Sequence, residues 1–332
     1  MNQFFKNKTI LITGATGSFG RRFVDYILKN FKDIKKVVVF SRDELKQFQM
    51  QNEISTKYTK KLRFFLGDIR DKDRLERAFE NVDIVVHAAA LKQVPAAEYN
   101  PFEFVKTNVL GSQNIIDAAL KNKVTNVLAL STDKAVAPIN LYGATKLCSE
   151  KLFISANNIS GNKNIKFSVV RYGNVFGSRG SVYPVFKKFK DSNYFPITDL
   201  KMTRFNMSLK ESVDFVTWSL VNSIGGEIFV PKLPSYNIVD LAKAVDNSKK
   251  NKIIGIRPGE KIHEVLISDS ELHCTYDCGK YFAIYNNPPL KISKKIRKKR
   301  LKKVKLNSYS SGNNLKFLNK SQLKKIIKDF EK

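Results

Sequence analysis

The sequence has few of the residues that build disulfide-bonded, fibrous or membrane-spanning proteins. Its 332 residues include only three Cys, 16 Gly and 10 Pro, without a compositional repeat. A small, odd number of cysteines does not make a disulfide framework and indicates a reducing compartment. No apolar run approaches the roughly 18 residues that a membrane span requires, and the first residues do not form a charged-then-apolar leader. We therefore expect a globular, cytoplasmic protein.

Acidic residues are also scarce, because 30 Asp and Glu stand against 59 Lys and Arg, a net charge of +29. The excess is uneven: residues 291–332 hold 16 basic residues but only Asp329 and Glu331, a net +14. The stretch from Lys291 to Lys305 has ten basic residues and no acidic one. Such a run favours weak contact with an anionic surface. It contains no aromatic residue, so we interpret it as a solvated tail and expect no nucleic-acid binding; a binder acting through this tail is the remote alternative.

Short apolar segments recur along the chain and are separated by helical patterns. A chain of this length has room for two lobes or one large α/β unit. Nearly continuous apolar strands joined by helices predict an α/β fold, with a doubly wound parallel sheet covered on both faces. We expect strands at residues 9–13, 36–40, 62–66, 82–87, 126–131, 166–171 and 226–230.

A glycine-rich turn follows the first predicted strand and opens a helix over about residues 18–30. Glycines three residues apart permit a tight turn and let backbone N–H groups approach a pyrophosphate at the helix N-terminus. With the strand before and the helix after, the pattern predicts dinucleotide binding in a Rossmann-type domain. The residues that carry it are Gly14, Thr16, Gly17, Ser18, Phe19 and Gly20.

The end of the second predicted strand bears on the choice of cofactor. Sites for NAD usually carry an acidic residue there to bind the ribose hydroxyls, whereas this sequence has Ser41 and Arg42. Arg42, with Lys46, suits a 2′-phosphate, so NADP is favoured over NAD although Asp43 and Glu44 lie close by. Further expected cofactor contacts are Asp68 and Ile69 after the third strand, and Ala88 and Ala90 after the fourth.

The remaining chain suggests a second lobe and a tail. We expect the nucleotide-binding domain to span residues 1–172 and to be rejoined by about 207–231. Segments 173–206 and 232–290 would form the smaller, substrate-binding lobe. Residues 291–332 would form a basic tail with a short helix, since Leu323, Ile326, Ile327 and Phe330 have helical spacing.

Tyr142 and Lys146 lie four residues apart, hence on one face of a predicted helix. The ammonium favours the phenolate, which then removes a proton from a substrate hydroxyl as hydride leaves the same carbon. Behind a glycine turn of this type, the pair resembles the short-chain dehydrogenase/reductase superfamily, in the extended form that acts on nucleotide sugars.

The end of the fifth predicted strand carries Thr132, Asp133 and Lys134. A plain 4-epimerase needs only a hydroxyl at the place of Thr132. Removing water across two carbons needs one group to take a C–H proton and another to protonate the departing hydroxyl. Asp133 and Lys134 supply both groups.

Several longer segments make the resemblance closer. They look like the inverting UDP-N-acetylglucosamine 4,6-dehydratases, which open pseudaminic acid synthesis for flagellin glycosylation. The similarity covers about residues 5–290 and resumes at YSSGNN (309–314), whereas the basic stretch from Lys291 departs from the family. The segments are AAALKQVP (88–95), STDKAVAPINLYGATK (131–146), RYGNV (171–175), PITD (196–199), MTRF (202–205) and GIRPGEK (255–261).

The resemblance implies a role for each matched position. Tyr142 would take the proton of the C4 hydroxyl, with Lys146 tuning it and holding the nicotinamide ribose and Thr132 bonding the same sugar oxygen. Lys134 would remove the C5 proton and Asp133 would protonate the C6 hydroxyl. NADP would stay tightly bound and be recycled, which makes the enzyme a hydro-lyase. The expected substrate, UDP-N-acetylglucosamine, would contact Lys92 (which also lies near the cofactor), Asn174, Arg179, Thr198, Met202, Arg257 and Glu260.

The resemblance also implies a homo-oligomer, a hexamer or a dimer. The alternative function is another nucleotide-sugar epimerase or dehydratase of capsule or lipopolysaccharide synthesis. We expect no metal site, because His263, His273, Cys274 and Cys278 match no common zinc spacing.

Overall fold

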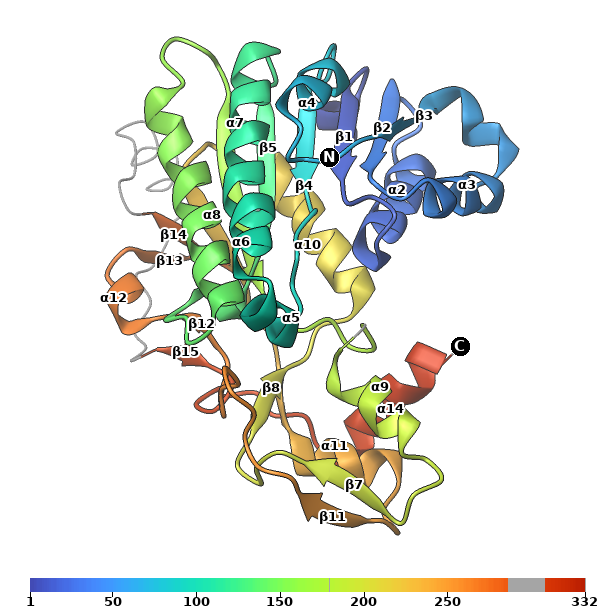
Figure 1. Cartoon of the computed structure of the whole chain (residues 1–332), viewed down its shortest axis with the longest axis vertical. Coiled ribbons are helices and arrows are strands. Elements are labelled where there is room, and N and C mark those ends of the chain that lie inside the picture. Colours follow the sequence, from blue (N-terminus) through green and yellow to red (C-terminus); the bar gives the residue numbers. More distant parts are fainter. Residues whose placement is uncertain (179, 286–307, 332) are drawn as a thin grey trace.

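A computed structural model describes residues 1–178, 180–285 and 308–331 (Figure 1). Within these residues, nine strands form one large sheet in the order β13-β14-β9-β6-β5-β4-β1-β2-β3. Neighbouring strands from β9 to β3 are parallel, and β14 and β13 extend the β9 edge antiparallel. The strands are β1 (Thr9–Thr13), β2 (Lys36–Ser41), β3 (Leu62–Leu66), β4 (Ile84–His87), β5 (Asn126–Thr132), β6 (Lys166–Tyr172), β9 (Glu227–Pro231), β13 (Thr275–Asp277) and β14 (Tyr281–Tyr285).

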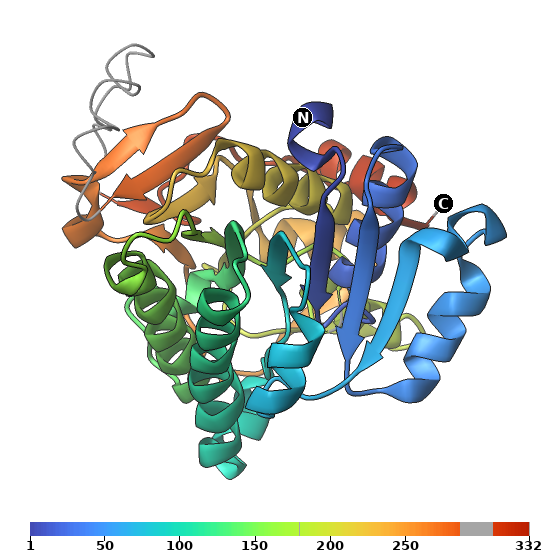
Figure 2. The same cartoon turned by 90° about the horizontal axis from the view of Figure 1, so that it is seen from above.

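Helices cover both faces of this sheet, and Figure 2 shows the two layers from above. α7 and α8 pack side by side on one face, whereas α2 and α10 contact each other on the opposite face. The helical segments of this part are α1 (Asn2–Phe5), α2 (Ser18–Asn30), α3 (Glu44–Glu53), η1 (Thr56–Lys61), α4 (Lys72–Ala78), α5 (Val94–Tyr99), α6 (Pro101–Phe104), η2 (Val105–Leu110), α7 (Gly111–Lys121), η3 (Asp133–Ala135), α8 (Leu141–Ile159) and α10 (Leu209–Asn222).

The central strands are buried because each is apolar along its whole length. All five residues of β1 and all four of β4 are buried, as expected when helices cover both faces of a parallel sheet. Each of the seven predicted strands is present, with ends that differ by at most two residues. The predicted α/β, doubly wound fold is therefore confirmed.

A smaller lobe lies below the carboxyl ends of the parallel strands (Figure 1). In it β7 (Tyr194–Ile197) pairs with β11 (Lys250–Ile253), and β8 (Thr203–Phe205) pairs with β10 (Ser235–Asn237). Helices α9 (Val182–Lys188), α11 (Ile238–Val245) and α14 (Lys320–Glu331) cover these strands. The core of the lobe is apolar and separate from that of the large sheet; it includes Phe186, Phe195, Ile197, Leu241 and Leu323.

Two segments lie elsewhere than the sequence predicted. β13 and β14, expected in the second lobe, belong to the large sheet, because the apolar strand β14 pairs with β9 along its whole length. The final helix does form, but it packs on α11 instead of standing apart as a tail, since Leu323 is fully buried in the core of the second lobe. β12 (Val265–Ile267), β15 (Tyr309–Ser310) and α12 (Asp269–Leu272) lie between the two parts.

Candidate functional site

A cavity of about 1210 Å³ runs along the carboxyl ends of the parallel strands. Ligands of open α/β sheets bind at this edge, because the strand-to-helix turns converge there. Every residue predicted to contact the cofactor lines the cavity, from Gly14 in the first turn to Lys146 on α8. These lining residues are Gly14, Thr16, Gly17, Ser18, Phe19, Gly20, Ser41, Arg42, Lys46, Asp68, Ile69, Ala88, Ala90, Lys92, Tyr142 and Lys146.

The glycine turn is so closely packed that a larger residue would not fit at two of its glycine positions. Gly14 has a φ of +66°, and a Cβ there would lie 2.9 Å from the Cα of Ala89. A Cβ at Gly20 would lie 2.4 Å from the Cα of Ala15, so only glycine allows α2 to start this close to the turn. The N-cap residue Gly17 and the first residues of α2 line the cavity, so an anion there would lie at the positive end of the helix. This cradle fits the pyrophosphate of a dinucleotide.

Asp43, an acidic residue shortly after β2, makes its contacts with the start of α3. Asp43 caps α3 by accepting a hydrogen bond from the backbone N–H of Lys46 at 2.9 Å, and it also pairs with the Lys46 ammonium. The side chain of Arg42 is about half exposed and lies 3.6 Å from the carboxylate of Asp68. Two cations thus line the end of the cavity where a ribose 2′ group would lie.

Tyr142 and Lys146 lie on the cavity side of α8, whose N-cap is Asn140. The Lys146 ammonium donates to the carbonyl oxygen of Leu130 at 2.8 Å, and burial lowers the pKa of Lys146 to about 8. Burial raises the pKa of Tyr142 to about 12, although Lys134 and a hydrogen bond with Thr132 oppose this shift. The phenol and the ammonium thus face the same end of the cavity.

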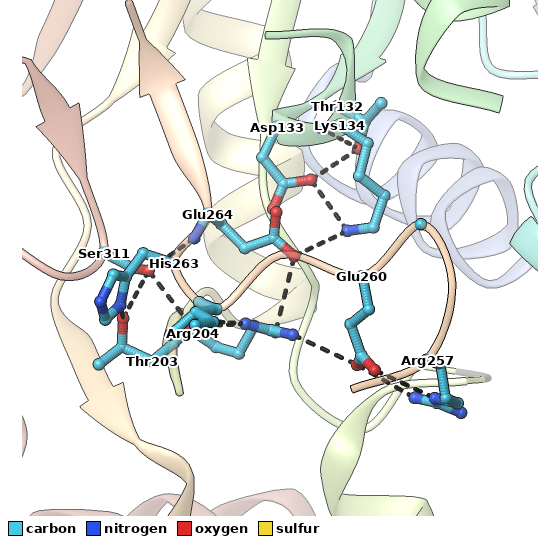
Figure 3. A network of polar contacts seen from close by, with 12 residues as sticks. Thr132, Asp133, Lys134, Thr203, Arg204, Arg257, Glu260, His263, Glu264 and Ser311 are labelled. Atoms are coloured by element: carbon cyan, nitrogen blue, oxygen red, sulfur yellow. Dashed lines mark hydrogen bonds and ion pairs between the residues drawn. The ribbon is translucent and has the colours of Figure 1, made fainter. Parts of the chain in front are cut away.

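Thr132, Asp133 and Lys134 lie where β5 passes into the short helix η3 (Figure 3). Asp133 Oδ1 accepts hydrogen bonds from the Thr132 hydroxyl at 2.8 Å and from Lys134 Nζ at 3.1 Å. η3 packs tightly on α8, since a Cβ at Gly143 would lie 2.2 Å from the carbonyl oxygen of Lys134. We call Thr132, Asp133, Lys134, Tyr142 and Lys146 the catalytic cluster.

One carboxylate oxygen of the catalytic cluster lacks a hydrogen-bond partner in the part of the chain that the structure describes. Within the described residues, Asp133 Oδ2 is buried and has no hydrogen-bond partner. A Cβ at Gly173, which lines the cavity, would lie 3.1 Å from this oxygen. A buried polar atom without a partner is costly and suits a group that bonds to a ligand instead. Burial and the neighbouring Glu264 raise the pKa of Asp133, which favours its protonated, proton-donating form.

The predicted substrate residues are spread over several places. Asn174 lines the cavity, whereas Arg257 and Glu260 lie in the second lobe and form an ion pair with two contacts of 3.1 Å. Met202 is buried in the core of that lobe, and Thr198 does not line the cavity. The candidate Arg179 lies outside the described residues, as does the stretch from Lys291 to Lys305.

Two charged residues of the site were missed by the sequence reasoning. Arg204, on β8, and Glu264, just before β12, are both almost fully buried, and Glu264 accepts a hydrogen bond from Lys134 Nζ at 3.3 Å. Arg204 lies in the segment MTRF (202–205), which contributes to the family resemblance. The local sequence does not indicate that its side chain is buried. Only the fold brings these positions to Lys134.

The described residues contain neither a membrane-spanning helix nor a metal-binding cluster. No helix in residues 1–178, 180–285 and 308–331 combines the length and apolar character needed to cross a bilayer. The same residues contain no group of three or more His, Cys, Asp and Glu side chains placed to hold a metal ion.

Comparison with known proteins decides the family. A family model described as "Polysaccharide biosynthesis protein" matches residues 10–286, and the chain is 50% identical, over 98% of its length and 99% of the relative's, to "UDP-N-acetylglucosamine 4,6-dehydratase (inverting)" of Campylobacter jejuni strain 81-176. The chain belongs to this family. The resemblance inferred from the sequence motifs is thereby confirmed.

Other family relatives carry a different name. The chain is 43% identical to "UDP-glucose 4-epimerase" of Rickettsia bellii strain OSU 85-389, over 97% of the chain and 96% of the relative. Among solved structures, "Pen from Bacillus thuringiensis" is 38% identical and has a TM-score of 0.87, with 98% of this chain and 99% of that one covered. A dTDP-glucose 4,6-dehydratase from Streptomyces venezuelae with bound NAD has a TM-score of 0.66 at 21% identity, over 76% of this chain and 86% of that one, and shares the fold.

Proposed function

We propose that this family member is a UDP-N-acetylglucosamine 4,6-dehydratase that inverts C5 and recycles a tightly bound NADP. The observation that carries the proposal is the catalytic cluster: Thr132, Tyr142 and Lys146 line the cavity. Asp133 and Lys134, hydrogen-bonded to each other, adjoin it through the hydrogen bond from Thr132 to Asp133. The 50% identity to the C. jejuni dehydratase supports the same substrate. The product would be a UDP-linked 2-acetamido-2,6-dideoxy-4-keto hexose.

The first step acts on the C4 hydroxyl. Tyr142 takes its proton, Thr132 hydrogen-bonds the same oxygen, and the cations at Lys134 and Lys146 favour the phenolate. A nicotinamide dinucleotide held by the glycine turn and Lys146 would supply, when bound, the capacity to accept hydride from C4 and to return it to C6. Lys146, which donates to the Leu130 carbonyl oxygen at 2.8 Å, would bond the adjoining ribose.

The second step removes water across C5 and C6. A keto group at C4 acidifies the C5 proton, which Lys134 takes as a neutral amine, and Asp133 gives its proton to the C6 hydroxyl, so that water leaves and a C5–C6 double bond forms. Transfer of one proton from the Lys134 ammonium to the Asp133 carboxylate, along their 3.1 Å contact, produces the required base and acid together. Addition of a solvent-derived proton to C5 from the face opposite Lys134, together with the hydride returned to C6, then removes the double bond and inverts C5.

Three observations support NADP over NAD in this proposal. Arg42 and Lys46 line the cavity, Ser41 stands where an acidic residue would repel a 2′-phosphate, and Asp43 is engaged by the start of α3. We also propose, from the family resemblance, a homo-oligomer in the cytoplasm whose product enters pseudaminic acid or a related surface glycan.

The second candidate function is a nucleotide-sugar 4-epimerase, favoured by the names of the Rickettsia relatives. An epimerase conserves the mass of its substrate and has no use for an acid and a base at C5 and C6. The paired Asp133 and Lys134 therefore favour the dehydratase.

Product analysis of UDP-N-acetylglucosamine incubated with the purified protein tests the proposal. We expect a mass loss of one water without added reductant, and a proton NMR signal for a C6 methyl group. In deuterated water, deuterium should enter C5. A product of unchanged mass would identify an epimerase, and stoichiometric consumption of added NADP would identify a dehydrogenase.

Lys134→Ala provides the matched variant for the second step. Tyr142 and Lys146 remain, so hydride transfer should continue while C5 proton removal fails. We expect the absorbance of reduced nicotinamide to accumulate, with the C6 hydroxyl kept and no deuterium at C5. Normal dehydration and labelling in this variant would remove Lys134 from the mechanism.

A further inference from the structure

Glu264 reaches the catalytic cluster from a distant part of the chain (Figure 3). Its Oε1 accepts a hydrogen bond from Lys134 Nζ at 3.3 Å, and Lys134 Nζ also donates to Asp133 Oδ1 at 3.1 Å. The lysine ammonium therefore lies between two carboxylates, of which Asp133 is 1% and Glu264 2% exposed.

The backbone of Glu264 is held independently of its side chain. Its N–H donates to the Ser311 hydroxyl at 2.9 Å, and its carbonyl oxygen accepts from the Ser311 N–H at 2.8 Å. Ser311 in turn contacts Thr203 on β8. The 308–314 segment thus fixes the position of Glu264, and its carboxylate is available for contacts in the site.

Charges from several elements surround Lys134. Asp133 comes from η3, Tyr142 from α8, Arg204 from β8, and Lys261 and Glu264 from the loop before β12. Arg204 Nε lies 3.6 Å from Glu264 Oε1, and Arg204 Nη2 lies 3.4 Å from Glu260 Oε1. Arg204 therefore joins Glu264 to the residues predicted to bind the substrate.

The Glu264 carboxylate is ionised, and one of its two oxygens makes no hydrogen bond within the described residues. Its Oε2 is buried and, within the described residues, has no hydrogen-bond partner. Burial opposes its charge, but Lys134 and Arg204 together outweigh burial and hold the pKa of Glu264 below its usual value. A carboxylate that stays ionised beside Lys134 influences every proton transfer there.

We propose that Glu264 is a positioning residue for the acid–base pair: it holds Lys134 Nζ beside Asp133 and supplies the fixed negative charge against which their shared proton moves. This inference rests on the proposed dehydratase function. It adds a third residue to the Asp133–Lys134 acid–base pair. This residue comes from the loop that also carries Arg257 and Glu260.

The charge of Glu264 acts on both members of the pair in the same direction. Burial is the larger cause of the raised pKa of Asp133, and the negative charge of Glu264 adds to it by disfavouring the Asp133 carboxylate. Burial would lower the pKa of Lys134, but the charges of Asp133 and Glu264 together outweigh burial and raise it. Removing this charge lowers both pKa values. Both limbs of the pH–rate profile, which report the pair as a whole, should then move to lower pH.

Glu264→Gln keeps the size of the side chain and removes its charge. We expect kcat to fall and both limbs of the kcat profile to move to lower pH by roughly one unit or more, with KM for UDP-N-acetylglucosamine little changed. Glu260→Gln, on the same loop and also bonded to Arg204, is the matched control and should raise KM with a smaller shift of the profile. A profile of Glu264→Gln that coincides with that of the unmutated enzyme would overturn the proposal.

A second measurement does not depend on turnover. Carbon-13 NMR titration of the Asp133 carboxyl in the holoenzyme, assigned by its loss in Asp133→Asn, should give a lower pKa in Glu264→Gln. If the unmutated protein did not dehydrate UDP-N-acetylglucosamine, the proposed function would fail, while an unchanged Asp133 titration would overturn the role of Glu264. Should Glu264→Gln not fold, Glu264→Asp retains the charge but lengthens the contact, and an unchanged kcat would contradict the proposal.

Discussion

The two ends of the cavity are built in different ways. The cofactor end is lined by turns that each follow a parallel strand, so its residues lie within a few positions of a recognisable strand end. The substrate end is the charged cluster that adjoins the cavity beyond Thr132. There Lys134 and Glu264 lie 130 positions apart in the chain, and Lys261 donates to the carbonyl oxygen of Val136 across 125 positions. The first end depends on local sequence, and the second depends on how two lobes meet.

The energetic demands of the two ends differ as well. The glycine turn offers backbone N–H groups and leaves no room for side chains at Gly14 and Gly20. The substrate end buries Asp133, Glu264 and Arg204 around the partly buried Lys134, and breaking such a cluster is costly because it leaves a buried charge without its partner. Substitutions should therefore change cofactor binding at the cofactor end. At the substrate end, substitutions within the buried charged cluster should change proton transfer, and substitutions at its exposed rim should change substrate binding.

The largest effect is expected at Tyr142, which lines the cavity and makes a hydrogen bond with Thr132. Tyr142→Phe removes the hydroxyl that takes the C4 proton, so turnover should fall by about 10²–10⁴-fold. Because hydride transfer is the first step, no absorbance of reduced nicotinamide should appear, in contrast to Lys134→Ala. Cofactor binding, followed by fluorescence quenching, should be retained. Accumulation of reduced nicotinamide in Tyr142→Phe would show that another group takes the C4 proton.

An intermediate effect is expected from Arg257→Ala at the substrate end. Hydrogen bonds to charged groups contribute about 1.5–3 kcal/mol, so losing a diphosphate contact should raise KM by about tenfold or more. The catalytic cluster is untouched, so kcat should stay nearly the same. Lys252→Ala, which removes an exposed positive charge from the nearby strand β11, is the control and should change neither constant. A fall in kcat with an unaltered KM would place Arg257 in the chemistry instead of in binding.

The smallest effect is expected at the cofactor end from Arg42→Ala. The Arg42 side chain is about half exposed, and exposed ion pairs contribute little, so NADP affinity should fall only roughly fivefold while NAD affinity stays the same. Arg22→Ala, on the exposed side of α2, serves as the control for lost positive charge. Titration calorimetry measures both cofactors. Equal affinities for NADP and NAD in the unmutated protein would contradict the assignment of NADP.

Much of the fold could be predicted from the sequence because its signals are local. Nearly continuous apolar strands such as Thr9–Thr13 have one stable environment, a sheet covered on both faces. Helical spacing likewise predicted α14, but not its place. Packing of Leu323 against α11 depends on a lobe whose strands all end at least 70 residues earlier in the chain, since the last of them ends at Ile253. For the same reason β13 and β14 were placed in the wrong part.

The sequence by itself determined the glycine turn and which side chains of β5, η3 and α8 stand near one another. Glycines after a strand, and Tyr142 and Lys146 four residues apart on one helix, have consequences that follow from backbone geometry alone. Only the tertiary structure decided that Met202 is a core residue and that Glu264 and Arg204 are buried beside Lys134. Their neighbours come from other elements, and the protonation of a buried charge depends on the groups that surround it in space and not on those beside it in the chain.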